Sequence, residues 1–248
     1  MSDDLIKESI DFLRQHQPKN DIYAVSLSMG KDSIVVKHLC EVANIPHKSF
    51  FISTRSDPPE VLQFAIKYYP DTKWYYPKVS MLEAIKYYGP PTRDNPWCHK
   101  ILKDNLRESI TTIPYIHRLS GLRADESEAR AKSNRIHLNK YPIITYKPIF
   151  YWPEETIWQY IKEYKLKIPI LYHWGFRHFM CMICPDMFGE EKEIVTNRIR
   201  SMKYWPKYWS AFEHVVRKSF SNDDLFDEYW KNYLNNFRKP VTQSCIIK

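Results

Sequence analysis

The chain is poor in glycine and has no long apolar run. Only 5 of its 248 residues are glycine while 44% are hydrophobic, so it has the composition of a folded chain with a buried core. No stretch approaches the roughly 18 apolar residues that a membrane helix requires. The first residues lack the basic start and apolar core of a signal peptide. We therefore expect a cytoplasmic protein with no membrane partner.

The cysteines do not indicate a disulfide framework. Their number is odd, at 5, and no export signal accompanies them, which favours reduced thiols that bind metal or do redox work. The formal charge of +8 suits an anionic ligand such as a nucleotide, sulfate or nucleic acid. Because this charge is spread along the chain, it is weak evidence by itself.

Hydrophobic periodicity predicts an α/β fold. Residues 21–28 have the pattern of a buried strand, and residues 32–43 continue with helical spacing. Further strands are expected at 47–54, 72–76, 116–120 and 145–149, with helices at 60–69, 80–88 and 100–110 between them. This alternation predicts a mostly parallel twisted sheet with helices on both faces. Beyond residue 190 the pattern is helical, most clearly over 223–237, so we expect an α/β domain at 1–190 and a helical extension with a tail at 191–248.

The turn between the first strand and its helix is suited to an anion. It reads Ser28-Met29-Gly30-Lys31-Asp32-Ser33, and such a turn directs backbone N–H groups and the positive end of the helix dipole at one point. Gly30 allows close backbone approach, Lys31 adds a charge, and Ser28 and Ser33 add hydroxyl donors. The simpler interpretation is an ordinary strand-to-helix turn in which Asp32 or Ser33 is the N-cap.

The turn differs from a P-loop at two positions. A P-loop requires glycine where this chain has Val25, and serine or threonine where it has Asp32. The turn instead resembles the SxGxDS signature of PP-loop pyrophosphatases and phosphoadenylyl-sulfate (PAPS) reductases. That resemblance implies a PP-loop, Rossmann-like domain that binds an adenylyl nucleotide through residues 28 and 30–33.

A second segment resembles the PAPS reductase family in particular. Residues 121–130 are similar to its GxRxxESxxR segment, with matches at Gly121, Arg123, Glu126, Ser127 and Arg130. In that family the arginines lie near the anionic groups of the nucleotide, and a guanidinium fork matches sulfate or phosphate geometry. A solvated helix start with intrahelical ion pairs remains the alternative.

The resemblance extends from about residue 21 to about residue 185. Residues 147–176 are similar to a family passage in which Pro-Ile, Trp, Tyr-Ile, Leu-Tyr and Gly follow one another in that order. One departure lies at 53–57, where the family has an acidic-Thr-Gly motif and this chain has no glycine. Thr54 is nevertheless expected at the nucleotide.

The resemblance also implies a metal centre. Family members with an iron–sulfur cluster use a Cys-Cys pair and a CxxC element, and this chain has Cys98-His99 and Cys181-x-x-Cys184 at those places. The expected cofactor is a [4Fe–4S] cluster on the three cysteines, with the fourth iron held by His99 or left open. Zinc in a Cys₃His set and a bare CxxC dithiol are the alternatives. Lys103 matches a family lysine that would neutralise this site or meet the sulfate.

Two cysteines lie outside that set. Cys40 is on the apolar face of its predicted helix and is expected in the core. Cys245 stands in the C-terminal tail, where PAPS reductases hold their nucleophile, although its neighbours differ from the family motif. It is either the nucleophile or an incidental thiol. The predicted catalytic residues are Cys245, Cys98 and Lys103.

Two functions are compatible with these residues. The first is a reductase that converts the sulfonyl group of an adenylyl sulfate to sulfite, with a thioredoxin-like reductant. The second is a sulfurtransferase that uses ATP with Mg²⁺ to thiolate tRNA or DNA through the three-cysteine site. The aromatic and basic residues at 203–209 favour a nucleic-acid partner if they are exposed, and a packing role if they are buried. An oligomer is compatible with either function.

Overall fold

The computed structural model describes residues 2–139, 142–179, 181–185 and 191–235. The chain forms two compact units. The first contains Met1–Ile52, Glu60–Tyr75 and Leu106–Trp174, and the second contains Ser53–Pro59, Tyr76–Asn105 and Gly175–Lys248. The second unit thus groups the helices beyond residue 190 with earlier segments of the chain. The domain boundary expected at residue 190 stays a prediction.

The first unit is built on a sheet of six strands in the described part of the chain, in the order β3-β2-β1-β4-β6-β5. The strands are β1 (Tyr23–Ser26), β2 (His47–Ile52), β3 (Lys73–Tyr75), β4 (His117–Leu119), β5 (Ile136–Leu138) and β6 (Ile144–Tyr146). All neighbours pair in parallel except β5, which is antiparallel to β6. The mostly parallel sheet is therefore confirmed. The edge strand β5 was not expected, because its residues are exposed or half-buried.

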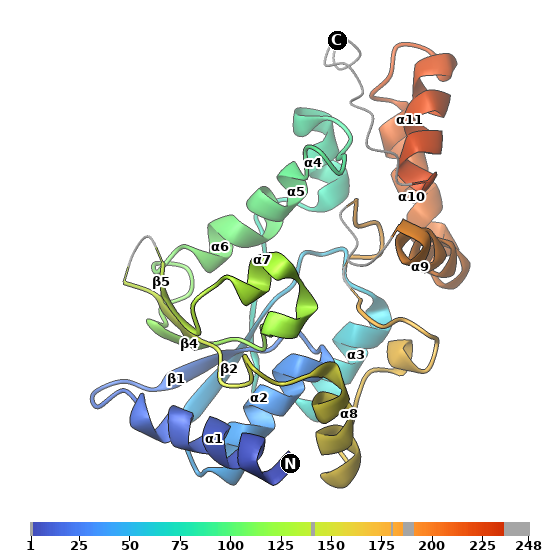
Figure 1. Cartoon of the computed structure of the whole chain (residues 1–248). Helices are drawn as coiled ribbons and strands as arrows, with labels where there is room; N and C mark the ends of the chain where they lie inside the picture. Colours follow the sequence, from blue (N-terminus) through green and yellow to red (C-terminus); the bar gives the residue numbers. More distant parts are fainter. Residues whose placement is uncertain (1, 140–141, 180, 186–190, 236–248) are drawn as a thin grey trace. The chain divides into compact units, whose positions relative to one another are not determined.

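Helices cover both faces of this sheet, because alternate strand residues point to opposite sides. On one face, the Tyr23 hydroxyl donates to the Leu13 carbonyl of α1 (Ser2–Gln15) at 3.2 Å. Here α1, α2 (Lys31–Val42) and α8 (Glu154–Glu163) contact one another (Figure 1). On the other face, Phe50 packs with Ile113 and with Leu106 of the short helix α6 (Asn105–Arg107).

The remaining elements of the first unit lie in its connections. The helix α3 (Pro59–Tyr68) connects β2 to β3, and η2 (Ala124–Glu126) and α7 (Glu128–Ala131) follow β4. The 3₁₀ turn η3 (Ile170–Tyr172) follows α8. None of the helices in the described ranges is both long and apolar enough to span a bilayer.

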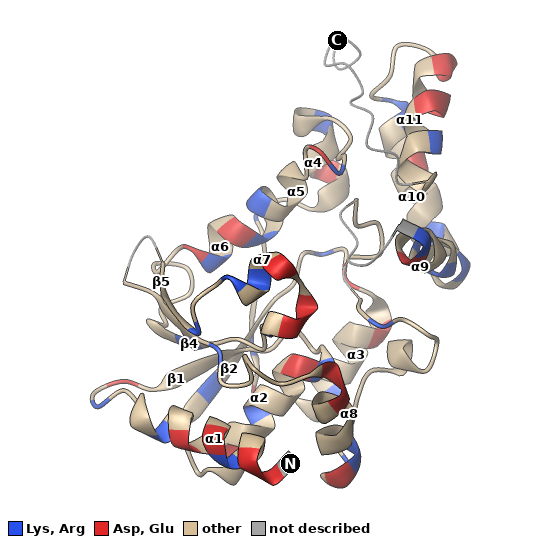
Figure 2. Cartoon of the chain, viewed as in Figure 1, with Lys and Arg blue, Asp and Glu red and all other residues tan. Residues whose placement is uncertain are grey.

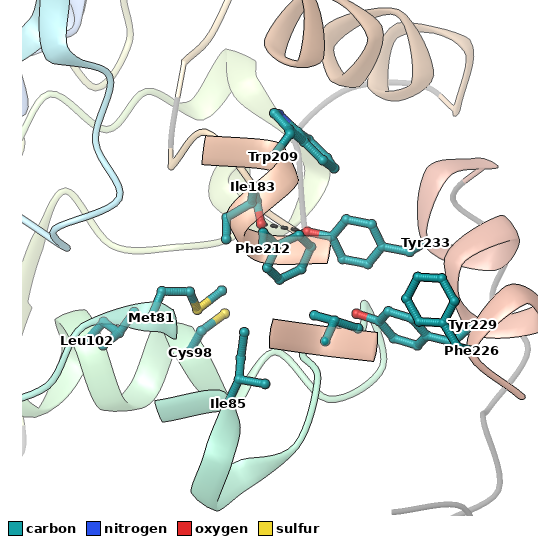
Figure 3. Close-up of a cluster of buried hydrophobic side chains, with 11 residues drawn as sticks. Met81, Ile85, Cys98, Leu102, Ile183, Trp209, Phe212, Phe226, Tyr229 and Tyr233 are labelled. Carbon is teal, nitrogen blue, oxygen red and sulfur yellow. Dashed lines mark hydrogen bonds between the residues drawn. The ribbon is translucent and has the colours of Figure 1, made fainter. Parts of the chain in front are cut away.

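The second unit is helical, as expected for the C-terminal residues. It contains α4 (Met81–Tyr88), α5 (Trp97–His99), the π-helical turn η1 (Lys100–Asp104), α9 (Glu191–Tyr204), α10 (Pro206–Arg217) and α11 (Asp223–Asn235). Its core is a cluster of aromatic and aliphatic side chains from α4, α10 and α11 (Figure 3). Trp205 and Trp209 are buried, so their rings are not available to stack on bases. This agrees with the packing interpretation of residues 203–209.

Candidate nucleotide site

The loops after β1 and β4 meet at the carboxyl ends of two adjacent parallel strands. After β1 the chain continues to β2 on one side of this pair of strands, and after β4 it continues to β5 and β6 on the other side. The direction in which strands are added to the sheet therefore reverses between β1 and β4. In open α/β sheets this switch point is the usual ligand crevice. A Cβ on Gly121 would lie 2.8 Å from the carbonyl carbon of Asp32 and 2.9 Å from the Ser33 nitrogen. Gly121 is therefore required by close backbone contact between the two loops.

The loop after β1 has one unusual backbone conformation, and it is not at the glycine. Met29 has φ 64° and a fully buried side chain. Gly30 has φ −73° and ψ 153°, which any residue adopts. A Cβ on Gly30 would lie 3.4 Å from Ser28 Oγ and 3.7 Å from Tyr172 Oη, which are ordinary contacts. The protein itself therefore does not require glycine at position 30.

Hydrogen bonds between the two serines close the turn. Ser28 Oγ donates to Ser33 Oγ at 3.2 Å, and Ser33 Oγ lies within hydrogen-bond distance of the Gly30 carbonyl, at 2.9 Å. The Gly30 N–H in turn donates to Ser28 Oγ at 3.4 Å, a long bond. Both predicted hydroxyl donors are thus held at the N-terminus of α2.

Lys31 is directed into the protein. Its Nζ is 0% exposed and lies 3.2 Å from Asp32 Oδ2 and 3.4 Å from Glu154 Oε1. The same atom is 5.9 Å from the ring centre of Trp158 and has no hydrogen bond of good geometry within the described residues. The charge expected at the anion is therefore balanced by two carboxylates.

Arg123 links the second loop to the first. Its Nε donates to Asp32 Oδ1 at 2.7 Å, and its Nη1 donates to Asp125 Oδ2 at 3.0 Å and to the Trp152 carbonyl at 3.1 Å. Burial lowers the pKa of Arg123, but the Asp32, Glu126 and Asp125 carboxylates together outweigh burial, so the pKa is raised above its ordinary value. Asp32 thereby bridges Lys31 and Arg123.

The rest of the second loop carries charges of both signs (Figure 2). Glu126 accepts from the Arg123 N–H at 2.8 Å and forms an ion pair with Arg130. Ser127 is the N-cap of α7 and accepts from the Arg130 N–H at 3.2 Å. The ion pair of the alternative interpretation is therefore present, although it joins the turn η2 to α7 and does not lie within one helix. The same loop also brings Gly121 and Arg123 to the turn at Asp32.

Three residues that contact the loop were not among the predicted site residues. The Lys31 N–H donates to the Tyr172 hydroxyl at 2.7 Å. Glu154, the first residue of α8, pairs with Lys31, and Trp158 packs edge-on against Tyr172. The family passage contains Tyr172, but nothing in the sequence indicates that a residue 141 positions away contacts the loop.

Thr54 belongs to the second unit, where its loop contacts a cysteine. Thr54 Oγ1 lies 3.1 Å from Cys181 Sγ. Arg55 stands where the family has glycine, and its φ of 60° lies in the left-handed region that favours glycine. Asp57 accepts from Ser53 Oγ and from the Thr54 N–H, both at 2.8 Å.

The predicted metal ligands are not gathered into one site. Cys98 is 9% exposed and lies in the apolar cluster beside Met81 and Ile85 (Figure 3). Cys184 is buried with Ile194, and His99 Nδ1 pairs with an Asp104 oxygen at 2.8 Å near the surface. Throughout the ranges that the structure describes, no three His, Cys, Asp or Glu side chains are arranged to hold a metal ion. The described residues therefore do not show the [4Fe–4S] cluster or the zinc site, and both stay predictions.

The remaining predicted thiols differ in their surroundings. Cys181 is partly exposed, and burial followed by the Asp57 carboxylate raises its pKa to about 11, while the nearby Lys103 opposes this rise. Cys40 is in the core, as expected, and burial raises its pKa to about 12. Cys245 lies outside the described residues.

Side chains of the second unit hold the CxxC turn by its backbone. The Met182 N–H donates to the Ser56 carbonyl at 2.8 Å, and Tyr233 donates to the Ile183 carbonyl at 2.6 Å. Arg198 donates to the Pro185 carbonyl at 2.8 Å. The C-terminal helices α9 and α11 thus fix the backbone that carries Cys181 and Cys184.

Comparison with known proteins identifies the family. The model of the phosphoadenosine phosphosulfate reductase domain matches residues 22–187, well over half of the chain. The chain belongs to this PAPS reductase family. Its fold is similar to that of phosphoadenylyl-sulfate (PAPS) reductase from Candida auris, with a TM-score of 0.57 and 18% identity over 73% of this chain and 93% of that one.

Four proteins with sequence similarity to this chain are informative. Uncharacterized protein MJ0066 from Methanocaldococcus jannaschii is 35% identical over 158 residues, 61% of this chain. The chain spans 32% of that relative and 56% of a second protein from the same organism. Adenosine 5'-phosphosulfate reductase from Shouchella clausii is 26% identical over 75% of this chain and 81% of its own length. Sulfate adenylyltransferase subunit 2 from Bacteroides fragilis is 25% identical over 82% of this chain and 80% of its own length.

Proposed function

We propose that this chain reduces the sulfonyl group of an adenylyl sulfate to sulfite by cysteine chemistry. The observation that carries the proposal is the turn at the sheet's switch point, where Ser28, Ser33 and the N-terminus of α2 come together at a glycine that the protein's own backbone and packing do not require. Family membership and the similarity to an adenosine 5'-phosphosulfate reductase support the identity of that anion.

In this proposal the loop holds the anionic end of the nucleotide. The N–H groups in the first turn of α2, together with Ser28 and Ser33, donate to the phosphate or sulfate oxygens. Arg123 and Arg130 give up some of their hydrogen bonds to carboxylates and donate to the sulfate instead. The buried positive charge of Lys31 offsets the negative charge of the bound anion. The role of Thr54 at the nucleotide remains part of the proposal.

The reaction has three steps. A cysteine thiolate, which we assign to Cys245, attacks the sulfonyl sulfur, and the S–O bond to the phosphate breaks with loss of the adenosine phosphate. A thiolate of an external dithiol reductant then attacks the cysteine sulfur of the resulting S-sulfonate, so that sulfite leaves and a mixed disulfide forms. The second thiol of the reductant attacks this mixed disulfide, which leaves the reductant as a disulfide and restores the Cys245 thiolate. Cys98 is a less suitable nucleophile, because it is buried among apolar side chains. Lys103 is proposed to attract the anionic substrate.

The proposal is tested by measuring sulfite. Purified chain is incubated with adenosine 5'-phosphosulfate or its 3'-phosphorylated form and a dithiol reductant such as thioredoxin. We expect sulfite with one of the two, loss of sulfite with Cys245→Ser, and retention with the core control Cys40→Ala. No sulfite from either nucleotide would reject the reductase.

A second candidate is adenylyl transfer from ATP. Each cation near the loop is already paired with a carboxylate, and Mg²⁺ is commonly bound by one or two carboxylates together with substrate phosphates. The similarity to sulfate adenylyltransferase subunit 2 points the same way. The iron–sulfur route to tRNA or DNA thiolation gains no support from the described cysteines. Pyrophosphate release from ATP and Mg²⁺ that depends on sulfate, DNA or tRNA would favour this candidate over the reductase.

A further inference from the structure

We propose that Tyr172 is a positioning residue for the phosphate loop, acting through its hydroxyl on the first N–H of α2. This inference rests on the proposed binding of an adenylyl nucleotide at residues 28–33. The first N–H groups of a helix have no partner within the helix and are the groups that bind an anion. In this chain the N–H of Lys31 donates to Tyr172 Oη at 2.7 Å.

The hydroxyl lies beside Gly30 in the turn. Tyr172 Oη is 3.7 Å from the position that a Cβ on Gly30 would occupy, so it is next to the proposed anion site. Because it takes the N–H of Lys31, the anion is left to the N–H groups of Asp32 and Ser33. Tyr172 thereby sets the direction in which the turn presents those groups.

Tyr172 is itself held rigidly and stays neutral. Its ring meets the Trp158 ring at 90° with centres 5.2 Å apart. Burial raises the pKa of Tyr172 well above its ordinary value, and the Asp32 and Glu154 carboxylates add to this rise, although the Lys31 N–H opposes it. The phenol therefore remains protonated at physiological pH and does not place a negative charge beside the bound anion.

The backbone N–H and the side-chain ammonium group of Lys31 both contact the segment that contains α8 and η3. Tyr172 of η3 binds its backbone N–H, and Glu154 of α8 pairs with its Nζ at 3.4 Å. Without the hydroxyl, this N–H loses its partner and the turn loses a contact that fixes its direction. We expect weaker binding of the anionic end of the nucleotide and unchanged binding of the adenosine end.

The test uses Tyr172→Phe, which keeps the ring against Trp158 and removes only the hydroxyl. Tyr151→Phe is the matched control, a tyrosine of the same unit that is 62% exposed. Calorimetric titration with adenosine 5'-phosphosulfate, ATP and adenosine should show Kd for the nucleotide ligands raised about tenfold in Tyr172→Phe, as expected for one hydrogen bond. Adenosine binding should be unchanged, and Tyr151→Phe should match the unmodified chain.

Amide hydrogen exchange in the nucleotide-free protein provides an independent measurement. The Lys31 amide should be protected in the unmodified chain and in Tyr151→Phe, and should exchange faster in Tyr172→Phe. If the unmodified chain binds no nucleotide, the proposed function fails, whereas this exchange result still tests the hydrogen bond. Equal nucleotide affinity in Tyr172→Phe, or an equal loss of adenosine affinity, would refute the positioning role.

Discussion

Gly30 and Gly121 flank the same backbone turn, and the structure predicts opposite results when each is replaced by alanine. At Gly30 the backbone angles are ordinary and the nearest atoms to a new Cβ are 3.4 Å and 3.7 Å away. At Gly121 a new Cβ would be 2.8 Å and 2.9 Å from backbone atoms of Asp32 and Ser33. The same chemical change therefore probes the ligand's space at one position and the protein's own packing at the other.

The stability effects follow from these distances. Alanine at a glycine position with compatible angles stabilises a protein by about 0.4–1 kcal/mol, because it restricts the unfolded chain. We expect Gly30→Ala to leave the free energy of unfolding unchanged or to raise it by that amount. Overpacking against backbone costs about 1–3 kcal/mol, so we expect Gly121→Ala to lower the free energy of unfolding by that amount.

For Gly30→Ala we expect nucleotide binding to weaken, although the free energy of unfolding does not fall. A methyl group in the anion's space displaces the phosphate or sulfate and weakens at least one charge-assisted hydrogen bond, worth about 1.5–3 kcal/mol. This corresponds to a loss of affinity of about tenfold to a hundredfold. Urea unfolding followed by tryptophan fluorescence gives the stability, and calorimetric titration with adenosine 5'-phosphosulfate gives the affinity.

Either of two results for Gly30→Ala would refute this reasoning. A destabilisation of more than about 1 kcal/mol would mean that the fold itself requires glycine at this position. Nucleotide affinity equal to that of the unmodified chain would mean that the anion does not bind against Gly30. Gly121→Ala controls for general sensitivity of the turn, since it is expected to lose stability.

Two further predictions concern Met29 and Cys181. Met29→Ala should lower the free energy of unfolding by about 2–5 kcal/mol through loss of a buried side chain, and Met29→Gly should be about 1 kcal/mol more stable than Met29→Ala because glycine relieves the left-handed φ. Urea unfolding measures both, and an alanine variant as stable as the glycine variant would contradict the strain. Because the pKa of Cys181 is about 11, its alkylation by iodoacetamide should accelerate about tenfold per pH unit from pH 7 until near that value. Mass spectrometry measures this rate, and a plateau below pH 9 would disprove the raised pKa.

Local patterns made the strand, turn and helix at residues 21–43 predictable. The buried strand and the apolar spacing of the helix are properties of consecutive residues. The strand β1 lies within its predicted range, and α2 begins one residue before its predicted range, at Lys31. The strand β5 escaped prediction because Leu138 is exposed and its pairing with β6 leaves little periodic signal. The left-handed backbone at Arg55 was not predictable either, because arginine does not favour that conformation.

The site depends on contacts between distant residues, which sequence patterns do not specify. Lys31 was expected at the anion, but Glu154 draws its ammonium group into the protein. Tyr172 contacts the turn from η3, and no pattern in the sequence shows that these two segments are close in space. The spacing of Cys98, Cys181 and Cys184 suggested a common metal, whereas apolar packing encloses Cys98 among side chains of α4, α10 and α11.

A crystal structure of the chain with adenosine 5'-phosphosulfate would test the central claim most directly. The account predicts a phosphate or sulfate group above Gly30, within hydrogen-bond distance of the N–H groups in the first turn of α2 and of Ser28 or Ser33. It also predicts that the Lys31 N–H remains bonded to Tyr172. A nucleotide bound with its anionic groups away from residues 28–33 would contradict the account.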